Sequence, residues 1–377
     1  MFMVFDHDGE ILLDVSKSGK ERPWKKHKTN SQLLSESFKR LDKVSKATNV
    51  EGCGSHLRFN VCPSGHEKRL TWANFCRVRL CPMCSWRRSL LIAHQLKEVA
   101  HEAVKQKPLR WLFLTLTVRN CEAKDLQETL THMMESWHRL IRRKPFKNAI
   151  VGWFRGLEIT RNTFEDTYHP HFHVLLAVEP NYFRKKDKYL TKDDFAALWQ
   201  KSLRVDYEPI VDIRIVKNKR NPEREIAILQ EKGVELGSDG AVSESELAGS
   251  AVAELAKYAT KADDFLVYNE YRKKQEGKKV VLYPDPRSGL NEIKTDEVVN
   301  VLDAGLSRRR LVAFGGFLKE IWNELQEKGK VQDAEDDNAD LVHVEGETNC
   351  KCSVCGSDML EELYSWLPNL NNYVKKE

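Results

Sequence analysis

Three histidines, His169, His171 and His173, alternate with other residues at the start of an apolar run. The branched and aromatic residues from Phe172 to Val178 predict a strand. Side chains two residues apart on a strand leave the same face, so His171 and His173 are expected to point together. Two imidazoles on one strand face are suitable ligands for a metal ion. The alternative is that each histidine is a satisfied polar residue at a strand edge.

A carboxylate that could complete this set lies in the segment that should form the neighbouring strand. Glu158 stands between Leu157 and Ile159, which are expected to face the core, so Glu158 should point to the histidine side. Two imidazoles and one carboxylate leave open positions on a metal for a substrate oxygen. Such mixed ligands favour Mn²⁺ or Mg²⁺ bound to phosphate, with Zn²⁺ as an alternative. Glu158 could also be an ordinary surface carboxylate.

A second set of reactive side chains lies on a predicted Ala-rich helix from Ala251 to Lys261. Glu254, Tyr258 and Lys261 are spaced i, i+4 and i+7, so they should share one helix face. A tyrosine oxygen can attack a phosphodiester when a metal polarises the phosphate. The carboxylate could later activate water, and the lysine could hold the phosphate. Taken alone, the same spacing fits a solvated Glu–Lys pair beside a half-buried tyrosine.

Most of the nine cysteines are clustered, and short spacings in a chain without a secretory signal favour metal over disulfides. A structural zinc site is predicted, because tetrahedral Zn²⁺ needs four soft or borderline ligands and can hold a small, loop-rich unit together. Cys62 and His66 are candidate substitutes in this set. The predicted ligands are Cys53, Cys76, Cys81 and Cys84.

Two further candidate sites are suggested by the remaining cysteines and by a pair of arginines. Cys350, Cys352 and Cys355 could form a second zinc knuckle near the end of the chain, with His343 as a fourth ligand. Arg87 and Arg88 follow the first knuckle and are candidates for DNA phosphate contacts; a solvated helix start is the alternative.

The elements that must position the central motifs alternate in a specific order. Apolar patterns predict β-α-β-β-α-β, the order of a ferredoxin-like, split βαβ core of the α+β class. Its helices should lie on one face of an antiparallel sheet, which leaves the other face for a site. The predicted strands are Trp111 to Val118, Ile150 to Thr160, Phe172 to Val178 and Ile210 to Val216, and the helices run from Leu126 to Leu140 and from a capping box at Thr191 to Leu203.

The 377 residues are long enough for two or three domains. We predict a cysteine-rich zinc-binding region over 1–105, the domain with the histidine and tyrosine motifs over 106–270, and a C-terminal helical extension over 271–377. Additional helices are predicted over 31–46, 86–105 and 308–325. The net charge of +5 is only mildly basic. Because no signal peptide or bilayer-spanning run is evident, a cytoplasmic protein without a membrane partner is expected.

The ordered motifs resemble those of HUH endonucleases. The similarity lies in Phe113 to Thr117, His169 to His173 and Glu254 to Lys261. It is greatest to the replication initiators of small bacterial rolling-circle plasmids, whose N-terminal cysteine region is also similar to Cys76 to Arg88. The resemblance covers Cys53 to Lys261.

This resemblance implies specific roles. His171 and His173 would be the metal ligands, with Glu158 as the third by position, and Tyr258 would be the single nucleophile. Glu254 would direct hydrolysis when replication terminates. Two-tyrosine initiators carry a tyrosine where this chain has Glu254, so the single-tyrosine branch is implied.

The implied activity is a DNA endonuclease and strand transferase that nicks a plasmid double-strand origin at a single-stranded or cruciform site. Host helicase and DNA polymerase would be its partners, and no Gly-x-x-x-x-Gly-Lys-Ser/Thr nucleotide loop is found. The first alternative is a relaxase or transposase of the same superfamily. The second is a zinc-bearing DNA-binding regulator without catalysis, whose histidines form a structural metal site.

Overall fold

The computed structural model describes residues 9–16, 19–216, 252, 255–256, 261–276, 279–344 and 350–376. The chain groups into two compact units, each assembled from separate stretches of sequence. Unit 1 comprises residues 1–91, 260–309 and 336–377, and unit 2 comprises 92–259 and 310–335. The three contiguous domains predicted from sequence differ from this division, because late segments of the chain join sheets that earlier segments begin.

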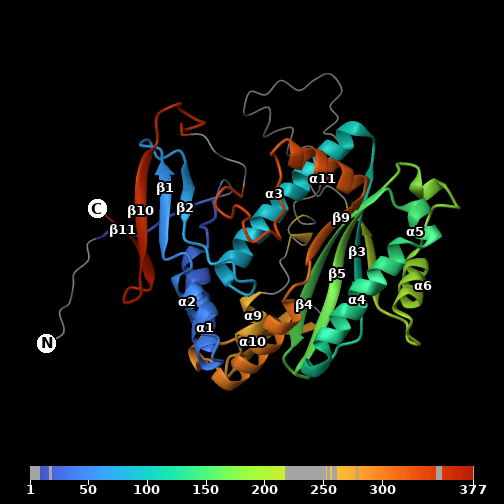
Figure 1. The fold of residues 1–377 in the computed structure, drawn as a ribbon, viewed down its shortest axis with the longest axis horizontal. Coiled ribbons are helices and arrows are strands. Elements are labelled where there is room, and N and C mark those ends of the chain that lie inside the picture. Colours follow the sequence, from blue (N-terminus) through green and yellow to red (C-terminus); the bar gives the residue numbers. More distant parts are fainter. Residues whose placement is uncertain are drawn as a thin grey trace. The chain divides into compact units, whose positions relative to one another are not determined.

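Unit 2 is built on a five-stranded antiparallel sheet with the order β6-β3-β5-β4-β9. The first four strands in this order are the four that the sequence predicts, and they are arranged as in the split βαβ core. In Figure 1 the orange β9 lies beside the green strands, so a late segment extends the sheet at its β4 edge. The strands are β3 (Arg110–Thr117), β4 (Gly152–Asn162), β5 (Thr167–Val178), β6 (Val211–Ile215) and β9 (Val312–Gly316).

Two helices cover one face of this sheet, α4 (Leu126–Ile141) and α6 (Lys192–Leu203). The apolar stripe of α4 is buried, and its Trp137 makes an edge contact with Phe172 of β5. Trp199 of α6 contacts the same phenyl ring from another side. The predicted capping box is present: the Thr191 side chain accepts from the N–H of Asp194, whose carboxylate accepts from the N–H of Thr191.

The opposite face is not wholly free, contrary to the sequence prediction. Helix α11 (Phe317–Glu327) places Trp322 on Phe314 of β9, and that ring contacts Phe154 of β4. Phe154 lies on the face away from Phe172, because it is opposite Leu175 in the ladder. Helices therefore cover both faces at this end of the sheet.

The predicted helix from Arg308 to Leu325 is wrong in its first half, where the chain forms β9. The backbone turns from β9 into α11 at Gly316, whose φ is +57°. A Cβ at Gly316 would stand 2.6 Å from the carbonyl oxygen of Val151, so only glycine fits this turn. Phe314 therefore belongs to a strand of the sheet and not to the apolar face of a helix.

Unit 1 contains a four-stranded antiparallel sheet with the order β11-β10-β1-β2. The red β10 beside the blue β1 in Figure 1 shows that the end of the chain completes a sheet begun near its start. Helix α1 (Trp24–Arg40) begins and ends earlier than the helix predicted over 31–46, and a separate helix, α2 (Val44–Gly52), follows it. The sheet consists of β1 (His56–Val61), β2 (Lys68–Ala73), β10 (Leu360–Leu367) and β11 (Asn372–Lys376).

Helices and a hairpin complete the two units. Within unit 1, Arg40 of α1 pairs with Asp296 of α10 at 2.7 Å. None of the helices in the described ranges is long and apolar enough to cross a bilayer. The remaining elements are α1 (Trp24–Arg40), α2 (Val44–Gly52), α3 (Pro82–Gln106), α5 (Lys144–Ala149), α9 (Ala262–Phe265), β7 (Tyr271–Glu276), β8 (Lys279–Pro284) and α10 (Glu292–Leu306), with short 3-10 turns at Ala123–Asp125, Tyr182–Arg184 and Pro286–Ser288.

Candidate metal centres

The antiparallel pairing of β4 and β5 brings the three predicted metal ligands of unit 2 together. Glu158 lies directly opposite His171 in the ladder, and strand alternation points His173 to the same face. This face is the one away from Phe172 and its helices. All three side chains are buried, with 3–7% of their surface exposed. We call Glu158, His171 and His173 the triad.

The ligand atoms of the triad converge on one point. The Nε2 atom of His173 lies 2.8 Å from Glu158 Oε2, and the Nε2 atom of His171 lies 3.3 Å from the same oxygen. The two Nε2 atoms are 3.1 Å apart. Neighbouring ligands that each lie about 2.1 Å from one metal are separated by about 3 Å, so these spacings suit a shared cation.

Hydrogen bonds at the other ring nitrogens explain why both Nε2 atoms face inward. His171 Nδ1 lies 3.1 Å from the carbonyl oxygen of His169, which can only accept, so this nitrogen carries the proton. His173 Nδ1 lies 3.3 Å from the hydroxyl of Thr115 on β3. With its Nδ1 protonated, His171 presents the lone pair of Nε2 toward the other two side chains. Two imidazole nitrogens and a carboxylate oxygen that face one another form a donor set that fits a divalent metal.

His169 belongs to the same strand but not to the triad. The prediction that it precedes the strand is wrong, because β5 begins at Thr167. Its Nδ1 lies 2.8 Å from the side-chain oxygen of Asn120, and its ring centre is 5.2 Å from that of His171. Burial, and then the nearby His171, lower the pKa of His169.

Two residues of the predicted tyrosine helix, Glu254 and Tyr258, lie outside the described residues. Their described neighbours Val252 and Leu255 are helical and buried in unit 2. A Cβ added to Gly156 would stand 3.3 Å from the carbonyl oxygen of Leu255. Gly156 is two residues from Glu158 and opposite His173, so its missing side chain would point to the triad face. Leu255, three residues before Tyr258 in the sequence, therefore lies over this face.

Lys261 is placed differently from the sequence prediction. Its backbone is extended, with φ −101° and ψ 162°, and it caps the separate helix α9. The N–H of Lys261 donates to the carboxylate of Asp264 at 2.8 Å, which begins α9. A continuous helix that carries Lys261 one turn beyond Tyr258 is therefore wrong, because the helical repeat ends before this lysine.

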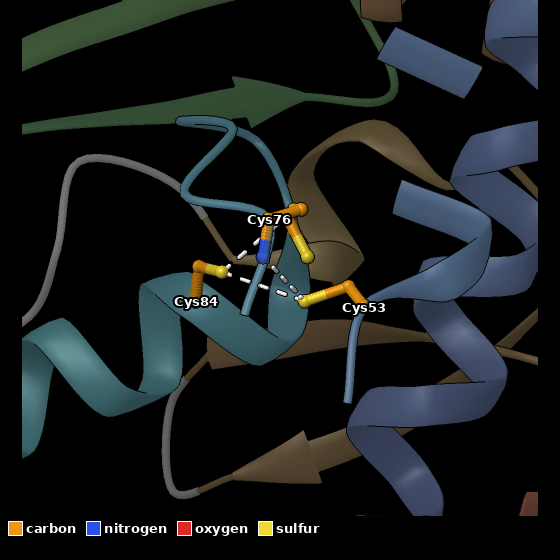
Figure 2. Close-up of side chains that lie close together, drawn as sticks. Cys53, Cys76 and Cys84 are labelled. Atoms are coloured by element: carbon orange, nitrogen blue, oxygen red, sulfur yellow. Dashed lines mark hydrogen bonds between the residues drawn. The ribbon is translucent and has the colours of Figure 1, made fainter. Parts of the chain in front are cut away.

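In unit 1 the four predicted zinc ligands come together, and we call them the four-cysteine cluster. Cys53 follows α2, Cys76 and Cys81 lie in the loop before α3, and Cys84 lies in the first turn of α3. Figure 2 shows the side chains of Cys53, Cys76 and Cys84 approaching one another. The Sγ atom of Cys84 is 3.5 Å from that of Cys53 and 3.8 Å from that of Cys76. Four sulfurs at about 2.3 Å from one Zn²⁺ are separated by about 3.8 Å.

The surroundings of this cluster suit thiolates. The N–H of Cys76 donates to Cys53 Sγ at 3.3 Å, and the N–H of Arg77 donates to Cys84 Sγ at 3.2 Å. The buried ammonium of Lys28 donates to the carbonyl oxygen of Cys53 at 2.9 Å. Hydrogen bonding among the thiols, followed by burial, raises the pKa of Cys53 well above its usual range. Four cysteine sulfurs gathered in this way form the ligand set that structural Zn²⁺ binds as thiolates.

The other candidate ligands separate from this cluster. Cys62 and His66 do not substitute for any of the four cysteines; they lie with Cys352 and Cys355 in a different group. His343 is not a ligand of the second knuckle, because its Nδ1 pairs with the carboxylate of Asp340 at 2.7 Å. We call the group of Cys62, His66, Cys352 and Cys355 the hairpin cluster.

The prediction that Arg87 and Arg88 contact DNA needs correction, because both are buried, with 3% and 2% of their surface exposed. The guanidinium of Arg87 donates to the carbonyl oxygens of Leu341 at 2.8 Å and Val342 at 2.7 Å. It also lies 5.4 Å from the ring centre of Trp24. A side chain enclosed and satisfied in this way serves packing in unit 1 and is not presented to a phosphate.

Sequence reasoning missed the roles of Thr115 and Asn120. Thr115 is directly opposite His173 in the β3–β5 ladder, and its hydroxyl approaches that ring. The alternation of threonine with apolar residues from Phe113 to Thr117 was a signal that these hydroxyls share one face. Asn120 follows the strand, and nothing in its spacing indicated a contact with His169.

Comparison with known proteins supports a single family. Residues 67–374 match the replication protein family, which is most of the chain. The chain is 38% identical over 381 residues to "Protein rep" of Bacillus amyloliquefaciens, covering 98% of this chain and 99% of that protein. It is 36% identical to "Protein rep" of Streptococcus pneumoniae serotype 2, covering 89% and 91% of the two chains.

A third relative, "Protein rep" of Lactiplantibacillus plantarum, is 34% identical and covers 97% of this chain and 98% of its own length. The family match runs through both units and includes the triad strands, Cys76, Cys81, Cys84, Cys352 and Cys355. These matches confirm the predicted relationship to replication initiators. The chain therefore belongs to the replication protein family.

Proposed function

We propose that this protein initiates rolling-circle replication of a plasmid by nicking one strand of the double-strand origin. Tyr258 would hold the 5′ phosphate in a covalent bond, and the freed 3′ hydroxyl would prime host DNA polymerase. After one round the same chemistry would rejoin the ends. Unwinding would require a host helicase, because no nucleotide-binding loop is present in the sequence.

The observation that carries this proposal is the convergence of the triad on the sheet face that the Leu255 segment crosses. A buried pair of imidazoles with a carboxylate has no packing role that requires their polar atoms to face one another. Its position beside the segment that leads to Tyr258 supports a site for phosphodiester chemistry. Family membership supports the same conclusion independently.

The triad would hold Mn²⁺ or Mg²⁺, which would polarise the scissile phosphate. The backbone carbonyl of His169 and the hydroxyl of Thr115 would position the two ligand rings, because each lies against the Nδ1 atom of one of them. In the cleavage step the Tyr258 oxygen forms a bond to phosphorus and loses its proton. The bond between phosphorus and the 3′ oxygen breaks, and that oxygen takes up a proton as it leaves. The number of phosphodiester bonds is conserved, so no energy-supplying cofactor is required.

Glu254 would serve the terminating event. With one tyrosine, the second cleavage needs another nucleophile, and water is suitable only if a positioned base removes its proton. Glu254 is four residues before Tyr258, a spacing that corresponds to one face of a helix. Lys261 is omitted from this scheme, because its backbone leaves the helical repeat.

The four-cysteine cluster would bind a structural zinc ion that holds the first part of unit 1 together. Its sulfurs come from the end of α2, the loop before α3 and the first turn of α3, so one ion would connect these segments. This zinc would have no part in the chemistry, because its ligands leave no open position for substrate.

A nicking assay on supercoiled plasmid carrying the origin tests the proposal. The wild-type protein with Mn²⁺ should produce nicked circles and a covalent protein–DNA adduct, and EDTA should abolish both. Tyr258→Phe removes only the attacking oxygen, so DNA binding should persist while adduct and nicking are lost. His171→Ala and His173→Ala should also abolish nicking, whereas His169→Ala should be milder.

Two outcomes would overturn the proposal. An adduct formed by Tyr258→Phe would show that another residue is the nucleophile. Intact supercoiled plasmid in the presence of tightly bound wild-type protein and Mn²⁺ would indicate a DNA-binding regulator instead. Tyr268→Phe is a suitable control for general effects of losing a tyrosine hydroxyl, since Tyr268 lies in unit 1 near α9.

A further inference from the structure

The hairpin cluster joins two parts of unit 1 that are nearly three hundred residues apart in sequence. Cys62 directly follows β1, and His66 lies in the turn between β1 and β2. Cys352 and Cys355 lie in the loop that precedes β10. The sulfur atoms of Cys62 and Cys355 are 3.6 Å apart, with 293 residues between their positions.

The spacing of the four ligand atoms suits a tetrahedral metal. Cys62 Sγ lies 3.6 Å from His66 Nδ1, and Cys352 Sγ lies 3.9 Å from the same nitrogen. All four ligand atoms lie within 4.8 Å of one another. With Zn–S about 2.3 Å and Zn–N about 2.0 Å, a tetrahedral site requires separations of about 3.5 to 3.8 Å. The sulfur separation is also far longer than the ~2.05 Å of a disulfide.

Both halves of the cluster use tight turns that present their ligands toward one another. The N–H of Gly65 donates to the carbonyl oxygen of Cys62 at 2.8 Å, and Gly65 has φ +74°. The N–H of Gly356 donates to the carbonyl oxygen of Cys352 at 2.9 Å, and Gly356 has φ +69°. These positive φ values favour glycine, so the turns are built into the sequence on either side.

A carboxylate links the two turns around the cluster. Glu67, next to His66, accepts a hydrogen bond from the N–H of Ser353 at 2.9 Å and another from its hydroxyl. Ser353 is the residue after Cys352, so the two loops are held together beside their ligands. Arg69 forms an ion pair with Glu67 and completes this support. Support of this kind around the ligands is typical of metal sites.

We infer that the hairpin cluster binds a second zinc ion, which fastens the C-terminal hairpin β10–β11 to the hairpin β1–β2. The site lies at the end of the β1–β10 ladder, where Val61 pairs with Leu360. Three sulfurs and one imidazole in a tetrahedral arrangement are a typical structural zinc set. The ion would close the long loop between Cys62 and Cys355 and secure one end of the two central strands, β1 and β10, of the four-stranded sheet.

The two zinc sites differ in access. His66 and Cys355 are exposed, whereas three of the four cysteines in the four-cysteine cluster are fully buried. A chelator should therefore remove zinc from the hairpin cluster before it removes zinc from the four-cysteine cluster. Once this ion is lost, the backbone amides of β10 should exchange with solvent more rapidly, because the metal no longer holds the loop that precedes β10 against the β1–β2 turn.

The test is the zinc content of the purified full-length protein, measured by elemental analysis and native mass spectrometry. The wild type should hold about two zinc ions per chain. The double variant Cys352→Ser plus Cys355→Ser should hold one, as should His66→Ala, while His66→Cys should retain two because a thiolate can replace the imidazole. Cys350→Ser and His343→Ala are matched controls that should keep both ions.

Full zinc retention by the double variant, or by His66→Ala, would overturn the inference. If those variants fail to fold, chelator titration of the wild type decides the question. Release of one zinc together with faster exchange confined to β10 and its neighbours supports the site, and release of all zinc in a single step with global unfolding contradicts it. These readouts do not depend on nicking, so the result stands apart from the proposed function.

Discussion

The triad of unit 2 and the four-cysteine cluster of unit 1 are both candidate metal sites, but they are embedded in different ways. The triad side chains project from β4 and β5, whose pairing runs without interruption from Gly152 opposite Ala177 to Asn162 opposite Thr167. The cysteines lie mainly in loops between short elements. We expect the triad to keep its geometry without a metal, and we expect a metal at the four-cysteine cluster to stabilise the loops around it.

The residues that surround each site explain why the two sites should depend on a metal to different degrees. Behind the triad, Phe172 and its helices form a packed apolar layer that needs no metal. At the four-cysteine cluster, the backbone N–H groups of Cys76 and Arg77 donate to the sulfurs themselves. Metal removal should therefore cost activity in unit 2 and stability in unit 1.

The largest expected effect is a loss of stability in unit 1. Cys84→Ser removes a buried ligand, so zinc is lost and the free energy of unfolding should fall by more than about 4 kcal/mol. Thermal unfolding and zinc analysis measure this. Cys121→Ser is the control, because Cys121 belongs to none of the three groups of candidate ligands among the described residues. If Cys84→Ser keeps wild-type stability, the cluster does not create the fold of unit 1.

A second prediction separates two roles within unit 2. Glu254→Ala should still nick origin DNA and form the Tyr258 adduct, because it is not needed for the first attack. Termination by hydrolysis should slow by about 10²- to 10⁴-fold, as expected when a general base is removed. Multimeric single strands should then accumulate on a gel in place of unit-length circles. Loss of the initial nick in a folded protein would instead make Glu254 the base or a ligand for the first step.

A smaller effect is expected at the third ligand of the triad. Glu158→Ala should weaken Mn²⁺-dependent nicking by roughly 10- to 100-fold, as with other altered metal shells. Thermal unfolding should remain close to that of the wild type, because the carboxylate faces the imidazoles and not the apolar layer. Glu165→Ala is a matched control at the exposed turn between β4 and β5. A large loss of stability in Glu158→Ala would contradict the expectation that ligand loss affects activity in unit 2 and stability in unit 1.

The smallest effect concerns the buried arginine. Arg87→Ala leaves the carbonyl oxygens of Leu341 and Val342 without their donor, which should lower the free energy of unfolding by about 1–3 kcal/mol. The salt dependence of DNA binding should not change, because no phosphate contact is lost. Denaturant unfolding and binding isotherms at several salt concentrations measure both. If Arg87→Ala instead makes DNA affinity less dependent on salt and leaves stability unchanged, Arg87 contacts a DNA phosphate.

Several features could be predicted from the sequence because their information is local. The spacing of His171 and His173 on one strand, the position of Glu158 between two apolar residues, and the capping box at Thr191 each depend on periodicity within a few residues. The same is true of the β-α-β-β-α-β order, which the sheet of unit 2 confirms. Such patterns determine the face of a strand or helix on which a side chain lies, so the three residues of the triad could also be predicted.

Other features were decided only by the tertiary structure. Nothing near Cys62 indicates that its partners are Cys352 and Cys355, and nothing near Val312 indicates a strand that joins β4 instead of a helix. These pairings depend on which distant segments pack together. The burial of Arg87 has the same origin, because carbonyl oxygens from residues 341–342 enclose it. Sequence spacing therefore determined the individual ligands, and long-range packing determined which of them share a site.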